Sequence, residues 1–276
     1  MIPFDFEYYK PDSIIEAVQT YQGLSNTGKN PFYYAGGTEI ISMARVGSVR
    51  PGAVIDIKGI PECCVSEFRG DRLILGAAVP LTHITESRLF PLLGLTGGRV
   101  ADHTIQHKIT LGGNLAGTII YRETVLPLLL TDSRLMLAGP GGQREILIHD
   151  VFDGRLCLQP GEFLVQVITE REFTGVPFVH VKKTRQDKID YPLLTVAALK
   201  KDGQIRAAFS GLCGFPFRSR AIEKCLNDKT QSVDMRLNQS LRFMPAPILS
   251  DIAGSAEFRA FVFRKTMTDA IEVLDS

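Results

Sequence analysis

Two stretches are the most informative part of the chain: Tyr33-Tyr34-Ala35-Gly36-Gly37-Thr38-Glu39-Ile40, the first glycine loop, and Ile109-Thr110-Leu111-Gly112-Gly113-Asn114-Leu115, the second glycine loop. In each loop a Gly-Gly pair is directly followed by a small polar residue. Glycine adopts left-handed backbone angles and lacks the Cβ that would block a ligand, so successive amides can converge on a phosphate oxygen. Thr38 and Asn114 add side-chain donors beside these amides. Together the loops predict a site for a phosphate-rich cofactor.

A single loop of this kind carries little information, because Gly-Gly before Thr or Asn also occurs in ordinary turns. Two loops of the same pattern, far apart in the chain, favour a shared ligand. Neither loop is a P-loop, since no Gly-Lys-Ser/Thr follows, and neither has the Gly-x-Gly-x-x-Gly spacing of a Rossmann turn. A different fold is therefore expected to hold the ligand.

At these loops the chain resembles a known family, the FAD-binding subunits of molybdenum hydroxylases such as xanthine dehydrogenase and carbon monoxide dehydrogenase. The first loop is similar to the family's Ala-Gly-Gly-Thr-Asp/Glu segment, and the second to its Thr-x-Gly-Gly-Asn segment. The resemblance covers nearly the whole chain and continues, in the family's order, through residues 124–130, 160–164, Lys182 with Asp190, and 211–223.

The resemblance implies which residues contact the FAD. The segment around the pyrophosphate matches Tyr33, Ala35, Gly36, Gly37, Thr38, Glu39 and Ile40. The second phosphate and ribityl contact matches Thr110, Gly112, Gly113 and Asn114. Near the flavin ring, Leu164 matches an apolar position and Lys182 a lysine, while Glu123 stands where the family usually has an aspartate. The resemblance implies no catalytic residue and no metal ligand in this chain.

Several of these residues also have a simpler interpretation. Tyr33 and Ile40 are of types that usually anchor a loop in the core. Lys182 is equally compatible with a solvated strand position. Glu39 cannot neutralise a phosphate, so it either reaches a sugar hydroxyl or faces water.

One segment departs from the family pattern. Where many members read Asn-Ala-Ser-Pro-Ala-Ala-Asp-Thr, this chain has Gly117-Thr118-Ile119-Ile120-Tyr121-Arg122-Glu123-Thr124. Ile119 replaces a hydrogen-bonding serine, and Glu123 is longer than the usual aspartate. The ribityl and isoalloxazine contacts are therefore open, and the segment indicates a subgroup with its own electron acceptor.

Composition sets independent bounds. The chain has 276 residues, 45% hydrophobic and 22% charged, with a net charge of +1, as in a globular protein without a nucleic-acid or membrane surface. No apolar run is long enough to span a membrane and the N-terminus lacks a signal peptide, so a cytoplasmic location is expected. Five cysteines without a Cys-x-x-Cys motif predict buried free thiols and neither disulfides nor a metal site.

The order of expected elements predicts an α+β fold. Strands are expected at 33–34, 54–57, 73–79, 135–137 and 145–148, and helices at 14–18, 40–44, 124–130, 218–226 and 256–274. Residues 193–199 and 204–209 flank Asp202-Gly203 and predict a hairpin. Breakers at 174–177 suggest a boundary between residues 1–176, by resemblance an FAD-binding domain of the vanillyl-alcohol oxidase or PCMH type, and residues 177–276, a small antiparallel sheet covered by helices.

The resemblance implies an electron-transfer subunit within a hetero-oligomer. A large molybdopterin subunit would oxidise the substrate, a small subunit with 2Fe-2S clusters would pass electrons on, and FAD here would deliver them to NAD or another acceptor. Two alternatives are a stand-alone flavin oxidoreductase of the same fold and a scaffold subunit that binds flavin poorly. The sequence does not identify the substrate of the complex, its electron acceptor or its oligomeric state.

Overall fold

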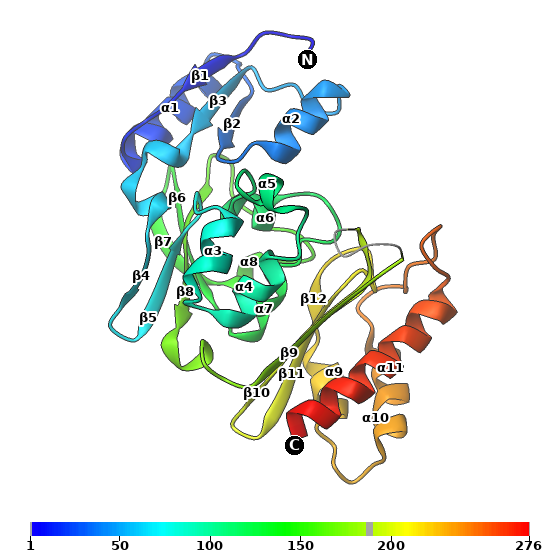
Figure 1. The fold of residues 1–276 in the computed structure, drawn as a ribbon. Helices are drawn as coiled ribbons and strands as arrows, with labels where there is room; N and C mark the ends of the chain where they lie inside the picture. The colour runs from blue at the N-terminus through cyan, green and yellow to red at the C-terminus, as the bar shows by residue number, and fades with distance from the viewer. Residues whose placement is uncertain (1, 186–189, 276) are drawn as a thin grey trace. The chain divides into compact units, whose positions relative to one another are not determined.

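The computed structural model describes residues 2–185 and 190–275. Within these residues, helices combine with three β-sheets, which confirms the predicted α+β class (Figure 1). The chain divides into two compact units: unit 1 comprises Met1–Ile84, His103–Gly117 and Ser133–Glu170, and unit 2 comprises Thr85–Asp102, Thr118–Asp132 and Arg171–Ser276. Residues 85–102 and 118–132 thus pack in unit 2, although they precede the predicted domain boundary. The functional division at residue 176 stays a prediction.

Unit 1 contains a parallel sheet whose strands, in order across the sheet, are β1 (Glu7–Tyr9), β3 (Ala53–Asp56) and β2 (Pro31–Tyr34). The central strand β3 is buried at every position. Helix α1 (Ile14–Asn26) begins as predicted, because the Ser13 side chain accepts a hydrogen bond from the amide of Glu16. Helix α2 (Thr38–Arg45) follows β2 after three residues, so the first glycine loop joins a strand to a helix.

The second sheet of unit 1 is antiparallel, with strand order β4 (Ser66–Arg69), β5 (Arg72–Gly76), β8 (Phe163–Glu170), β6 (Arg134–Gly139) and β7 (Gly142–Leu147). Its central strand β8 is almost wholly buried. The short helices around it are α3 (Leu81–Ser87), which runs on into unit 2, α5 (His103–Gln106), α6 (Leu111–Ala116) and α8 (Ile148–Val151). The second glycine loop forms the start of α6.

Unit 2 is built on an antiparallel sheet with strand order β12 (Phe217–Arg218), β11 (Gln204–Ser210), β10 (Pro192–Lys201) and β9 (Phe178–Thr184). The predicted hairpin joins β10 to β11, and Asp202 and Gly203 at its turn both have positive φ, as a type I′ turn requires. The helices of the unit are α4 (Pro91–Gly97), α7 (Val125–Leu130), α9 (Arg220–Leu226), α10 (Val233–Ser240) and α11 (Ala256–Asp275).

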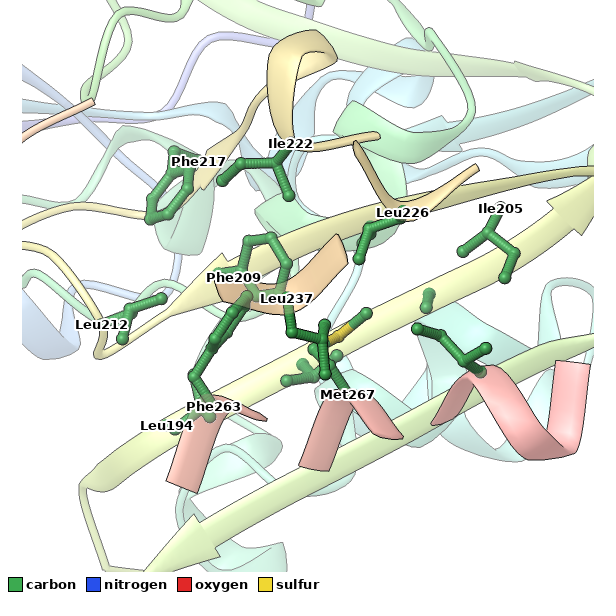
Figure 2. Close-up of a cluster of buried hydrophobic side chains, with 14 of the residues drawn as sticks. Leu194, Ile205, Phe209, Leu212, Phe217, Ile222, Leu226, Leu237, Phe263 and Met267 are labelled. Carbon is green, nitrogen blue, oxygen red and sulfur yellow. The ribbon is translucent and has the colours of Figure 1, made fainter. Parts of the chain in front are cut away.

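The core of unit 2 lies between its sheet and its C-terminal helices (Figure 2). Leu194 of β10 and Phe209 of β11 point to the same side, as the two-residue period of a strand allows. Phe263 and Met267 of α11, four residues apart on one helix face, pack against them. This layer confirms that helices cover the C-terminal sheet.

Helix α11 buries Ile271 and Leu274 of its apolar residues but not Phe258 and Phe261. Phe258 and Phe261 remain 49% and 56% exposed, whereas Arg259 is fully buried. The Arg259 guanidinium donates hydrogen bonds to the carbonyl oxygens of Leu193 and Gly211. The guanidinium also pairs with the Asp251 carboxylate over 2.7 Å, which supplies a counter-ion for the buried charge. Phe263, rather than Phe261, faces the sheet.

Other differences are small and have local causes. The strand expected at 54–57 ends at Asp56, because the Asp56 carboxylate accepts from the amide of Lys58 and starts a turn of 3-10 helix. Helix α9 begins after Arg218, which belongs to β12. All five cysteines lie in the described part as free thiols, and two of them, Cys64 and Cys157, are exposed rather than buried. No described helix has the length and hydropathy of a membrane span.

Candidate functional site

The fold of unit 1 brings the two glycine loops into contact. A Cβ at Gly36 would lie 1.7 Å from the carbonyl oxygen of Lys108, just before the second loop, and 3.4 Å from the amide nitrogen of Thr110. Only a residue without a side chain allows this backbone approach. The Glu39 carboxylate likewise lies close to Gly117, because a Cβ at Gly117 would be 2.7 Å from its Oε2. Segments about 70 residues apart in the sequence thus form one site.

The first loop presents a helix start without a side-chain cap. Gly37 precedes α2 with a φ of +70°, a conformation that favours glycine, and makes no side-chain cap. The first-turn amides of an α-helix have no partner within the helix, and the helix dipole adds partial positive charge there. The ring of Tyr34 covers Gly37, since a Cβ at Gly37 would lie 2.2 Å from its Cε2. This geometry suits the binding of an anion such as a phosphate.

The second loop differs, because its glycine amides already have acceptors in the protein. The amide of Gly112 donates to the Ala77 carbonyl oxygen over 2.8 Å. The amide of Gly113 donates to the Thr110 hydroxyl, which caps α6 over 3.2 Å. In this geometry the two amides donate within the protein, and their contact with a phosphate stays a prediction. Contacts of the second loop with a cofactor through other atoms stay a prediction.

Gly112 has a packing reason to be glycine, because a Cβ there would lie 2.6 Å from the Cβ of Ala77. Gly113 has more room, with Thr110 Oγ1 at 2.9 Å as the atom that its Cβ would meet. The second loop thus packs the start of α6 against Ala77, and the residue before the loop, Lys108, contacts Gly36 of the first loop.

Two further candidates, Tyr33 and Leu164, pack within unit 1. The ring of Tyr33 lies between Tyr21 and Phe163, with centroid distances of 5.1 and 4.4 Å, and its hydroxyl donates to the Gly161 carbonyl oxygen. Burial raises the pKa of this hydroxyl. Leu164 is 4% exposed within β8. The position of Tyr33 agrees with the anchoring interpretation, and a flavin contact by Tyr33 or Leu164 stays a prediction. Ile40, in α2, is half-buried.

Two further candidates, Glu123 and Lys182, lie in unit 2 and bind each other. The Lys182 ammonium donates to the Glu123 carboxylate over 3.0 Å and to the Arg99 carbonyl oxygen over 2.8 Å. Both side chains are nearly inaccessible, at 3% and 4% exposure, so Lys182 is not a solvated strand residue. Thr195 donates to the other carboxylate oxygen of Glu123.

This pair changes what Lys182 can do. Burial raises the pKa of the Glu123 carboxyl, while the Lys182 charge and the Thr195 hydrogen bond oppose that shift. Because the ammonium and the carboxylate neutralise each other, Lys182 carries little net field toward a ligand in this arrangement. The extra length of Glu123 relative to aspartate lets it reach both partners.

The pattern of glycines did not reveal two residues at the first loop. Lys58 donates to the carbonyl oxygen of Ala35, and Asp56 binds Lys58. The only sequence signal is that Asp56 ends a short buried strand, which is where turn-forming carboxylates occur. Among the described residues, no group of His, Cys, Asp and Glu is placed to hold a metal ion.

Comparison with known proteins shows the family of the chain. Residues 4–169 match the family model described as the FAD binding domain in molybdopterin dehydrogenase. That match spans more than half of the chain, and it includes both glycine loops. The chain therefore belongs to this family, whose members are oxidoreductases.

Individual relatives are distant. The carbon monoxide dehydrogenase medium chain of Hydrogenophaga pseudoflava is 26% identical over 192 residues, which cover 67% of this chain and 66% of that protein, just under two thirds. The glyceraldehyde dehydrogenase medium chain of Sulfolobus acidocaldarius is 25% identical, covering 85% of each chain. The xanthine dehydrogenase FAD-binding subunit of Escherichia coli O157:H7 is 24% identical, covering 93% of this chain and 90% of that protein.

A solved structure shares the whole fold. A chain in the structure of carbon monoxide dehydrogenase from Hydrogenophaga pseudoflava superimposes with a TM-score of 0.88 and 23% identity, covering 99% of this chain and 98% of that chain. The same arrangement of elements is thus present in a molybdenum enzyme, although identity at this level shows the fold alone.

Proposed function

We propose that this chain is the FAD-carrying electron-transfer subunit of a molybdopterin-dependent hydroxylase. The observation that carries the proposal is the start of α2, where a left-handed Gly37 opens an uncapped helix N-terminus against the second loop. The amides of this first turn would hold the diphosphate of FAD, and the remaining predicted contacts follow the family resemblance. By that resemblance the FAD-binding part is of the PCMH type.

The residues present fit FAD at the diphosphate more clearly than at the ring. When bound, FAD would accept electrons singly and release them as a pair, which suits a subunit between iron–sulfur clusters and NAD or another two-electron acceptor. Unit 1 would bind and orient the cofactor. In unit 2, Glu123 and Lys182 bind each other, and their contact with the flavin ring is proposed from the family resemblance alone.

The partners of this proposal are a large molybdopterin subunit and a small iron–sulfur subunit. Support comes from relatives named as medium chains or FAD-subunits of carbon monoxide, glyceraldehyde, nicotinate and xanthine dehydrogenases. Their differing substrates agree with a division in which the substrate is chosen by another chain. Within this proposal, a xanthine dehydrogenase-like complex is one form that the whole enzyme would take.

A second candidate function is a scaffold subunit with little flavin. The bonded amides of Gly112 and Gly113, together with Ile119 in place of a serine, favour it. Purification of the tagged chain from its own host, followed by an absorbance spectrum and metal analysis, tests both candidates. We expect FAD, iron and molybdenum in one complex. A metal-containing complex without flavin would favour the scaffold.

The stand-alone alternative is tested on the purified chain. Loaded with FAD, it should show negligible oxidation of purines and aldehydes, while exchange of electrons with NADH or an artificial dye would remain. Steady turnover of a purine or an aldehyde by the single chain, without molybdenum or iron, would overturn the subunit proposal.

A further inference from the structure

Lys58 reaches the first glycine loop from the turn that follows β3. Its ammonium donates to the Ala35 carbonyl oxygen and to both carboxylate oxygens of Asp56, each over 2.7 Å. An ammonium group has three N–H bonds, and these three acceptors match them. The charge of Lys58 is therefore directed at the backbone of the loop and at Asp56, rather than at a ligand.

Asp56 is a buried ion-pair partner of this lysine. Its side chain is 4% exposed at the end of the central strand β3. It also accepts from the Tyr8 hydroxyl over 2.6 Å and from the Lys58 amide over 3.0 Å. Burial alone would raise the pKa of the Asp56 carboxyl, but the hydrogen bonds from Lys58 and Tyr8 outweigh it and lower the pKa. Asp56 thus stays ionised and keeps its hold on the ammonium.

The same lysine touches the other side of the glycine pair. Its ammonium lies 4.7 Å from the centroid of the Tyr34 ring, within the range of a cation–π contact. That ring covers Gly37, where a Cβ would lie 2.2 Å from it. Lys58 therefore holds both the peptide before Gly36 and the ring over Gly37.

The bond to Ala35 has a direct consequence for the amide of Gly36. The carbonyl of Ala35 and the N–H of Gly36 belong to one planar trans peptide, so they point in opposite directions. Holding the carbonyl oxygen toward Lys58 fixes the N–H of Gly36 on the opposite side. Without that bond, the peptide could rotate between the flexible backbones of the loop.

We propose that the Asp56–Lys58 pair is the positioning element of the first glycine loop, which orients the Gly36 peptide before a diphosphate binds. The proposal rests on the proposed function of this loop as a diphosphate site. An oriented loop spends less free energy on ordering when the ligand arrives, so the pair acts on affinity through pre-organisation. Lys58 is thus a positioning residue without a ligand contact of its own.

The test compares three variants of the full chain with the wild type. Lys58→Met keeps the length and the apolar stem but removes the donors, and Lys58→Arg restores donors to both the carbonyl and the carboxylate. Lys29→Met is the matched control, because Lys29 pairs with Glu7 in the same unit and both side chains are exposed, at 39% and 46%. FAD and ADP affinity is measured by titration, and apo-protein hydrogen exchange is measured for peptides covering residues 35–40 and 110–116.

We expect Lys58→Met to weaken FAD and ADP binding at least about tenfold, with faster exchange at 35–40 and unchanged exchange at 110–116. Lys58→Arg should recover most of the affinity, and Lys29→Met should match the wild type. Unchanged affinity and exchange in Lys58→Met would overturn the role of Lys58 and leave the proposed function intact. An affinity loss that only follows the loss of folded protein would also overturn it. A wild type that binds neither FAD nor ADP would overturn the proposed function and this role together.

Discussion

The two glycine loops are nearly alike in sequence and differ in what their backbones do. In the first, Gly37 takes a left-handed φ and opens the start of α2 without a side-chain cap. In the second, the Thr110 hydroxyl caps α6, and the amides of Gly112 and Gly113 are bonded within the protein. The pattern Gly-Gly-polar thus occurs both at a helix start whose geometry suits an anion and at a packing contact, and the neighbouring residues decide which of the two forms.

The largest effect is expected where the loops meet. In Gly36→Ala the new Cβ would lie 1.7 Å from the Lys108 carbonyl oxygen, a backbone atom that cannot swing away. We expect a loss of about 3 kcal/mol in the free energy of unfolding, and loss of FAD binding with it. Urea unfolding and FAD titration measure both.

The control for this variant is Gly23→Ala in α1, where a Cβ meets nothing within 4 Å. It should raise stability by up to about 1 kcal/mol, since alanine favours a helix more than glycine. If Gly36→Ala behaves like Gly23→Ala, the two loops do not pack as described.

Gly37→Ala separates the conformation of the first loop from its packing. Gly28 has a similar φ, +73° against +70°, but nothing within 4 Å of a Cβ, whereas Gly37 lies against the Tyr34 ring. Gly28→Ala should cost about 1 kcal/mol of stability and leave FAD affinity unchanged. Gly37→Ala should lose the same stability, displace the Tyr34 ring and weaken FAD binding at least about tenfold. Equal FAD affinity in the two variants would show that Gly37 has no special role.

The second loop should respond through stability more than through affinity. Thr110→Val keeps the side-chain shape but removes the hydroxyl that caps the amide of Gly113, which should cost about 1 kcal/mol. Thr110→Ser keeps the hydroxyl and should cost less. FAD affinity should fall by less than about threefold in either variant. A larger fall in affinity for Thr110→Val, with stability unchanged, would move the anion site to the second loop.

A fall in pH is expected to lower the free energy of unfolding through His180 in unit 2. Burial lowers the pKa of His180 to about 4, and the positive charges of Arg99 and Lys182 add to this shift. Because the unfolded chain then binds more protons than the folded chain between pH 6.5 and 4, His180 stabilises the fold above that window and the contribution is lost as pH falls through it.

Between pH 7 and pH 6 this loss should be on the order of 0.7 kcal/mol in urea unfolding. His180→Gln should remove this part of the pH dependence, while FAD affinity stays constant over the same interval. A pH dependence of unfolding that His180→Gln leaves unchanged would show that another group carries it.

The sequence predicted the glycine loops, the strand before the first and the helix after it, because glycine and capping patterns act over a few neighbouring residues. It also predicted the hairpin at Asp202-Gly203, whose two residues both need positive φ. The family match confirms the resemblance on which the FAD assignment rests.

What the sequence could not supply depends on partners distant along the chain. Gly112 finds its acceptor at Ala77, and Lys58 finds the carbonyl of Ala35. The burial of Arg259 in α11 is invisible in a helical pattern, because arginine is normally an exposed type and its carbonyl partners at Leu193 and Gly211 are distant along the chain. Lys182 was ambiguous for the same reason, since its partner Glu123 lies 59 residues away.

The most direct test of the central claim, that the first glycine loop holds the diphosphate of FAD, is a titration of the purified full chain with FAD, ADP and FMN. FMN carries a single terminal phosphate, while FAD and ADP share a diphosphate. The account predicts saturable FAD binding, competition by ADP, and FMN binding at least about tenfold weaker than FAD, with the FAD and ADP affinities both reduced in Gly37→Ala but not in Gly28→Ala. FMN binding as tight as FAD, or FAD binding that Gly37→Ala leaves intact, would contradict it.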